Sequence, residues 1–171
     1  AQPEYRWTWR GKVNRPALGV KLLSWRTHGA ILAAAGCGRP ETPGGERNWD
    51  YRYTWIRDAS FTVYGFMRLG FIEEANGYMR WLKGRVGDCC DQPMKINILY
   101  GIDGRQELPE TELSHLSGHG GAQPVRIGNE AYDQVQLDIY GELMDAVYLV
   151  NKYGEAISHE GWKHTVEVAD Q

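Results

Sequence analysis

Two consecutive segments carry the apolar spacing of an α-helix, and only a short joint separates them. In the first, from Trp55 to Gly70, apolar side chains recur every three or four residues and also occupy other faces, which is typical of a buried helix. The second covers residues 72–84, and its inward positions are predicted to be Ile72, Ala75, Met79 and Leu82. Two helices joined this tightly form a helical hairpin. The chain is therefore expected to be all-α.

Three more helices are expected on either side of this hairpin. Asn14 and Pro16 suit the start of a short helix over about residues 15–26, because Asn caps helices and Pro favours their first turn. The longest helix is expected over residues 130–151, and Ser158 would cap a last helix over residues 159–170. The inward positions of these last two helices are predicted to be Tyr132, Val135, Ile139, Leu143, Ala146, Val150, Trp162, Val166 and Ala169.

The segments between the helices are expected to be mostly irregular. Residues 30–35 form an apolar run that is predicted to be extended and buried, whereas residues 36–45 are rich in Gly and Pro and must form a loop. Within residues 85–129, a short strand is predicted at 95–100 and a turn at Ile102–Gly104. Because this long segment contains Met, Ile, Leu and Tyr, we expect it to be ordered and functional.

The most informative stretch for function lies between residues 46 and 58. It combines four large aromatic side chains with three arginines, two aspartates and an asparagine, which suits neither a plain core nor a plain solvated face. A sugar needs both kinds of group, since its C–H faces stack on rings and its hydroxyls need directed hydrogen-bond partners. The seven tryptophans and ten tyrosines of the chain agree with a carbohydrate site, although burial of the rings explains them equally well.

The overall composition excludes several other classes of function. The net charge is −3 and no basic tract is present, so neither nucleic acid nor an anionic membrane is expected as a partner. No apolar run of about 18 residues predicts a membrane span. The cysteines, Cys37 and the pair Cys89-Cys90, suit neither a disulfide framework nor zinc, and no metal or cofactor is expected. A cytoplasmic location is the plain interpretation, with secretion left open because Ala1 need not be a natural start.

Four sequence motifs carry a family resemblance. Asn48–Phe61, which reads NWDYRYTWIRDASF, resembles the signature of the family-15 glycoside hydrolases, the glucoamylase and trehalase-like α-glucosidases. Tyr100–Arg105 (YGIDGR), Pro124–Asn129 (PVRIGN) and Gln134–Glu142 (QVQLDIYGE) resemble the same family, in order and at fitting spacing. The resemblance therefore covers nearly the whole chain.

This resemblance implies a fold and a reaction. The family's architecture is an α/α toroid of six helical hairpins with long functional connections, of which this chain would form part. The full enzyme would hydrolyse a terminal α-glucosidic bond from the non-reducing end and release β-glucose by inversion, without a cofactor. Starch-type oligosaccharides, isomalto-oligosaccharides and trehalose are all candidate substrates.

The resemblance also implies roles for individual side chains in binding substrate. Arg57 and Asp58 would hold the hydroxyls of the terminal glucose, Trp55 would line the same pocket, and Tyr51 would sit near the reacting centre. The residue types allow a plainer interpretation too, because Asp58 can cap a helix and Arg57 can form a structural ion pair.

Arg126 and Asn129 form a second candidate group. Both side chains are able to reach a sugar, but they are equally suited to fixing their own loop or capping the long helix that follows. Gln134, Gln136 and Asp138 lie at the expected start of that helix and would face either a cavity or solvent. The carboxylates in the loop around Pro109 are expected to be solvated.

The catalytic carboxylates are expected outside this sequence. An inverting glycosidase needs a general acid and a general base, and by the family's pattern both lie beyond Gln171. Residues 1–171 would then form an incomplete α/α-barrel catalytic domain, with residues 1–13 as a lead-in or a linker from a preceding domain. The alternative is a non-catalytic carbohydrate-binding or regulatory remnant of that fold. Either way, exposed apolar faces would meet the remainder of the domain or a second copy of the chain.

Overall fold

The computed structural model describes residues 8–36, 39–86 and 96–170, and this part of the chain is mostly helical. The helices are α1 (Arg10–Leu22), α2 (Ile56–Leu69), α3 (Ile72–Val86), α4 (Asp138–Tyr153) and α5 (His159–Ala169). Two short antiparallel pairs join β1 (Thr54–Trp55) to β2 (Leu99–Tyr100) and β3 (Thr111–Glu112) to β4 (Arg126–Ile127). Two 3-10 turns, η1 (His119–Gly121) and η2 (Glu130–Asp133), complete the elements.

The predicted helical hairpin is confirmed as α2 and α3. Gly70 ends α2 in the left-handed conformation, at φ 78°, a region that glycine enters without the steric cost of a Cβ atom. The amide of Phe71 then donates to the carbonyl of Phe66, so the chain reverses within two residues and α3 begins at Ile72. Both predicted helices therefore have the expected bounds to within two residues.

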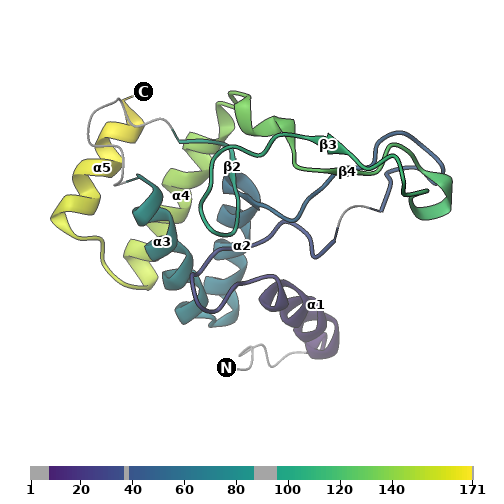
Figure 1. Cartoon of the computed structure of the whole chain (residues 1–171). Helices are drawn as coiled ribbons and strands as arrows, with labels where there is room; N and C mark the ends of the chain where they lie inside the picture. The colour runs from purple at the N-terminus through teal and green to yellow at the C-terminus, as the bar shows by residue number, and fades with distance from the viewer. Residues whose placement is uncertain (1–7, 37–38, 87–95, 171) are drawn as a thin grey trace.

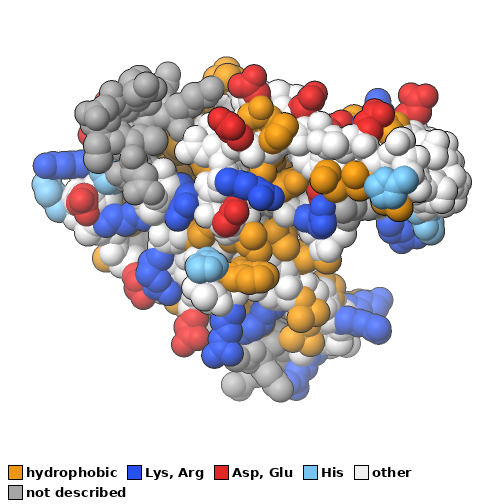
Figure 2. All heavy atoms as spheres, in the orientation of Figure 1, with side chains coloured by type: hydrophobic (Ala, Val, Ile, Leu, Met, Phe, Trp, Pro, Cys, Tyr) orange, Lys and Arg blue, Asp and Glu red, His pale blue; other side chains and the backbone are white. Residues whose placement is uncertain are grey.

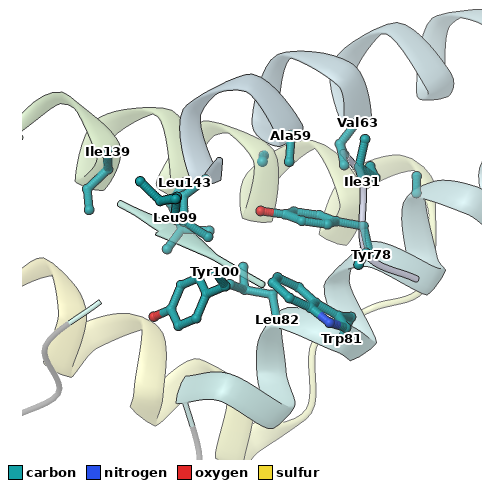
Figure 3. Close-up of a cluster of buried hydrophobic side chains, with 14 of the residues drawn as sticks. Ile31, Ala59, Val63, Tyr78, Trp81, Leu82, Leu99, Tyr100, Ile139 and Leu143 are labelled. Atoms are coloured by element: carbon teal, nitrogen blue, oxygen red, sulfur yellow. The ribbon is translucent and has the colours of Figure 1, made fainter. Parts of the chain in front are cut away.

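The core lies where α2 packs against α4, with α3 closing one side (Figures 1 and 3). The buried positions of α2 and α4 recur every three or four residues, as an amphipathic packing face requires. The apolar ones are Ile56, Ala59, Val63 and Phe66 on α2, and Ile139, Leu143, Ala146 and Val150 on α4. All four of these α4 positions were predicted to face inward, and that part of the prediction is confirmed.

An aromatic cluster fills the space between α3 and β2. Tyr78 stacks on Trp81 with ring centroids 5.9 Å apart, and Trp81 meets Tyr100 edge-to-face at 5.8 Å. Figure 3 shows these three rings packed beside Leu82 and Leu99. Tyr78 and Tyr100 are almost fully buried, so at least part of the tyrosine content serves the core rather than a ligand.

The first helix begins and ends earlier than predicted. It starts at Arg10, where the carbonyl of Trp9 accepts from the amides of the next turn, so Asn14 is not its cap and Pro16 lies inside it. The first turn is exposed to solvent, and no buried partner depends on the hydrogen bond that Pro16 cannot donate. The helix ends at Leu22 because Ser24 turns back to pair with Ile31.

The predicted long helix over residues 130–151 is two elements. The turn η2 ends at Asp133, the backbone of Gln134 after it is extended (φ −81°, ψ 158°), and α4 begins only at Asp138. Val135 was predicted to face inward, yet it is 68% exposed, and Leu137 is 78% exposed. The apolar spacing continues through the break, which is why it predicted one continuous helix.

The last helix has the predicted start and cap but a different buried face. The hydroxyl of Ser158 accepts from the amide of Gly161, as expected. Val168 is buried, whereas the positions predicted to face inward are exposed, and these are Trp162, Val166 and Ala169. The helix is thus rotated relative to the prediction, so that its small and polar side faces α3 and α4.

The connections follow the expected pattern in outline. Ala30 and Ile31 are buried, and the amides of Ala33 and Ala34 donate to the chain just before β1, so most of the predicted extended run is confirmed. β2 lies within the predicted strand, whose first residue is outside the described part. Figure 1 shows the β3–β4 hairpin as an arm that extends away from the helices, and Figure 2 shows it standing out from the body. No helix in the described ranges is long and apolar enough to cross a membrane.

Candidate functional site

Three of the predicted site residues lie where a strand becomes a helix. Trp55 is extended and pairs with Leu99 in the β1–β2 ladder, and the next amide, that of Ile56, donates to the carbonyl of Ile98. This pairing fixes the start of α2, so Arg57 and Asp58 occupy its first turn. The strand pairing therefore positions all three side chains at one end of the helix.

Arg57 connects the first turns of α2 and α4. Its Nη1 donates to Gln136 Oε1 at 2.7 Å and to Asp138 Oδ2 at 2.6 Å. The guanidinium carbon also lies 6.0 Å from the centre of the Trp55 ring. The side chain of Arg57 remains 32% exposed and that of Asp138 48% exposed, so this group lies at the surface of the described part rather than in its core.

Asp58 and Tyr51 lie close to this group and are less constrained. Asp58 is exposed, and within the described residues no hydrogen bond or ion pair engages its carboxylate. It does not cap α2, because the cap position belongs to Trp55. Burial, and then the charges of Glu41 and Asp58, raise the pKa of Tyr51, which keeps its phenol protonated.

The most highly connected polar group is Asp50, which the sequence did not single out as a site residue. Its carboxylate accepts from the Nε and Nη2 of Arg52 at 2.9 and 2.8 Å, from the Tyr53 hydroxyl at 3.2 Å, and from the Gly128 amide at 3.3 Å. Gly128 has φ 86°, and a Cβ there would collide with the carbonyl oxygen of Pro109, so only glycine fits. We call Asp50, Arg52, Tyr53 and Gly128 the Asp50 cluster.

Asn129 and Arg126 lie beside the Asp50 cluster, and in the described part of the chain neither makes a hydrogen bond to Arg57. The amide nitrogen of Asn129 donates to the carbonyl of Asp50, and its oxygen accepts from the amide of Ala131, so it caps η2 rather than the long helix. Arg126 pairs with Glu110 at 2.7 Å and covers the Trp49 ring at 4.8 Å. Both side chains hold loops in place, which agrees with their structural interpretation, and a sugar role stays a prediction.

The described residues contain no group of three or more His, Cys, Asp or Glu side chains that would bind a metal ion. Two of the hollows in this part of the chain are lined by other residues, and neither includes Tyr51, Trp55, Arg57 or Asp58. One, of about 270 Å³, is apolar and lies between α3, α4 and α5, and the other is larger and more polar and lies between the end of α1 and α3. Arg57 and Asp138 are partly exposed and Asp58 is exposed, so the residues around Arg57 lie at the surface of the described part.

The chemistry of that surface suits a polyhydroxylated ligand. A free carboxylate accepts two or more hydroxyl hydrogen bonds, and a guanidinium donates in fixed directions from up to five N–H groups. The Trp55 ring supplies an apolar face beside them. The sequence predicted the residue types at this surface, but it missed Gln136 and Asp138 as partners of Arg57, because they lie 79 and 81 residues away.

Comparison with known proteins gives one consistent result. The profile described as Glycosyl hydrolases family 15 matches residues 12–170. The trehalases of Mycobacterium tuberculosis and Mycolicibacterium smegmatis are 43% and 44% identical to the chain over 164 residues, which is 94% of it. A trehalase of Thermoplasma acidophilum is 36% identical over 96% of the chain. The chain spans about a quarter of the length of these relatives, at 24%, 25% and 27%. No solved structure shows significant similarity to it.

Proposed function

Because this chain belongs to family 15 of the glycosyl hydrolases, we propose that it supplies the substrate-holding part of an enzyme that hydrolyses a terminal α-glucosidic bond. Trehalose is the first substrate to test, since the relatives that match nearly all of the chain are named trehalases. Maltose and isomaltose represent the other linkages that the family resemblance implies.

One observation carries this proposal: polar groups with unused hydrogen-bonding capacity surround an aromatic ring at the start of α2. Asp58 is exposed and unengaged within the described residues, and the Nη1 of Arg57 is held by protein acceptors while its Nε and Nη2 make no hydrogen bond there. In our proposal Asp58 and Arg57 hold the hydroxyls of the terminal glucose, Trp55 lines its apolar face, and the protonated Tyr51 lies near the bond to be cleaved.

The reaction proposed is direct displacement by water with inversion. A general acid protonates the departing oxygen while a general base activates a water on the opposite face, which places the two carboxyl groups roughly 6.5–9.5 Å apart. We propose that both are glutamates outside residues 1–171, consistent with relatives about four times as long as the chain. In that arrangement α2, α3, α4 and α5 belong to a six-hairpin α/α toroid.

The remaining assignments follow from this arrangement. Residues 1–13 would lead in from a preceding segment, and Arg126 and Asn129 would support the rim of the site. Apolar side chains exposed on the helices would contact the remainder of the catalytic domain or a second copy of the chain. Among these side chains are Leu22 on α1, Phe61 and Tyr64 on α2, and Trp162 on α5.

Glucose release from trehalose, maltose and isomaltose tests the proposal. This chain is assayed beside a longer product of the same coding sequence, and proton NMR follows the anomer first formed. We expect only the longer product to turn over, with β-glucose formed first and trehalose as the preferred substrate. Turnover by this chain alone would place the catalytic carboxylates within residues 1–171. Sugar binding without turnover by either product would favour a non-catalytic carbohydrate-binding protein.

A further inference from the structure

We propose that Gln136 and Asp138 are positioning residues that orient Arg57 toward the substrate. This inference rests on the proposed function, because it assigns Arg57 to the terminal glucose. It adds that the start of α4 and the residues just before it determine how Arg57 is oriented. The family comparisons assign no role to either residue.

The geometry divides the guanidinium of Arg57 into a held part and a free part. Both acceptors meet the same nitrogen, Nη1, with Gln136 Oε1 at 2.7 Å and Asp138 Oδ2 at 2.6 Å. A guanidinium is planar and carries five N–H donors. Within the described residues, Nη2 and Nε make no hydrogen bond, so fixing Nη1 leaves a planar edge with a defined direction.

An aromatic ring also lies beside the guanidinium. The Trp55 ring lies 6.0 Å from its carbon, on the residue that precedes α2 and that the β1–β2 pairing fixes. Gln136 is itself held, because its amide nitrogen donates to Gln134 Oε1 at 3.2 Å. A long, flexible side chain is thereby anchored at one nitrogen and covered by a ring. Preorganisation of this kind lowers the entropy lost on binding a ligand.

The alternative is that Arg57 and Asp138 simply tie α2 to α4. Two observations argue against a role in stability alone. The pair is substantially exposed, at 32% and 48% for the two side chains, and exposed ion pairs contribute only about 0–1 kcal/mol. The two helices already share a buried apolar face formed by residues such as Val63 and Leu143. Their packing therefore does not require the polar contact.

Steady-state kinetics of the active protein, meaning whichever length of it hydrolyses the glucoside, test this inference. Asp138→Asn keeps the size of the side chain and removes its charge, and we expect kcat/KM to fall on the order of tenfold, as for loss of a charged hydrogen bond. Gln136→Leu removes a neutral acceptor and should lower kcat/KM by about threefold. The matched control is Asp145→Asn, which changes an exposed aspartate two turns further along α4 and should leave activity unchanged.

A double-mutant cycle separates positioning from a merely structural role. In an Arg57→Met background, Asp138→Asn should cause no further loss, because its effect passes through the guanidinium. Asp138→Asn should also reduce the discrimination between a glucoside and its deoxy analogue that lacks the contacted hydroxyl. Loss of a merely structural tie would also pass through Arg57, but it would lower stability and leave this discrimination unchanged.

The outcomes are distinguishable. If Asp138→Asn matches Asp145→Asn, or if its loss is undiminished in the Arg57→Met background, the positioning role is overturned. If Asp138→Asn does not fold, Gln136→Leu is measured instead in the wild-type and Arg57→Met backgrounds. An equal loss of kcat/KM in the two backgrounds would overturn the inference. If wild-type protein hydrolyses none of the three glucosides, the proposed function fails instead.

Discussion

Asp50 and Arg57 come from one stretch of sequence, yet the Asp50 cluster and the surface around Arg57 use their polar groups in opposite ways. Asp50 is 1% exposed, and its carboxylate accepts hydrogen bonds from Arg52, Tyr53 and Gly128. A few residues later, Asp58 is exposed and unengaged within the described residues, and Arg57 is held by one nitrogen. A fully satisfied buried carboxylate fixes the backbone, whereas an exposed, unengaged one is available to a ligand.

This contrast distinguishes polar residues that hold the fold from polar residues that can bind. The Asp50 cluster secures the β4 loop against the chain before β1, and Asn48 adds hydrogen bonds to the carbonyls of Ala122 and Pro124. In our proposal the Asp50 cluster does not contact the sugar. It fixes the backbone that carries Tyr51. Substitutions in the two regions should therefore affect different measured quantities.

The largest expected effect is on stability, at Asp50. Asp50→Asn removes the negative charge and replaces one acceptor oxygen with an NH₂ donor that faces the donors of Arg52, Tyr53 and Gly128, and we expect the free energy of unfolding to fall by about 3 kcal/mol. Urea denaturation measures it. The control is Glu41→Gln, whose carboxylate pairs with an exposed Arg47 at 3.1 Å and should change stability by less than about 0.5 kcal/mol. Equal effects at the two positions would contradict the contrast.

The next largest effect should be on activity, at Asp58. Asp58→Asn removes an acceptor for sugar hydroxyls, and we expect kcat/KM to fall by about 10- to 100-fold. Stability should change by less than about 1 kcal/mol, the usual contribution of an acid in the first turn of a helix. Glu73→Gln is the control, because Glu73 is an exposed acid in the first turn of α3. Unchanged sugar affinity in Asp58→Asn would show that the site is misassigned.

Tyr51 and Tyr53 test the same contrast between stability and activity, with smaller expected effects. The Tyr53 hydroxyl donates to Asp50 and accepts from the Gly128 amide at 3.0 Å, so Tyr53→Phe should lower stability by about 1 kcal/mol. Tyr51→Phe should leave stability nearly unchanged and lower only kcat. Thermal melts and steady-state kinetics of both variants measure these effects. A stability loss in Tyr51→Phe with unchanged kcat would contradict the prediction.

The smallest effect is a dependence on pH. Burial alone would raise the pKa of Asp50, but hydrogen bonds from Arg52 and Tyr53 outweigh it and lower the pKa below its usual 3.8. A lowered pKa in the folded state gives stability that is fully present above the unfolded pKa and is lost as pH falls through the folded one. The stability gap between wild type and Asp50→Asn should therefore be constant above about pH 5 and narrow below about pH 4. A gap that widens in acid would refute this.

The sequence predicted those parts of the fold that depend on neighbouring residues. The α2–α3 hairpin follows from apolar spacing and from Gly70, and the start of α5 follows from Ser158, because each signal lies within a few residues of its effect. The break at Gln134 was missed, since apolar residues keep their spacing through it. The buried side of α5 was also missed, because contacts with α3 and α4 determine which face turns inward.

The candidate site divides in the same way. Residue types and a family resemblance singled out Trp55, Arg57 and Asp58, which the structure brings to one end of α2. Only the fold shows that Asp50 is buried and accepts several hydrogen bonds, and that Gln136 and Asp138 accept hydrogen bonds from Arg57. Side-chain partnerships across a long loop leave no periodic signal in a single sequence.

The contact between Arg57 and Asp138 has a consequence for the order in which the protein folds. The two residues are separated by 81 positions, so their meeting closes a long loop, and the entropy of closure must be offset by the packing of α2 on α4. The α2–α3 hairpin forms from local contacts and needs no such closure. We therefore expect binding competence to appear late, after most helical signal has developed, so that a collapsed chain with native helix content does not yet recognise sugar.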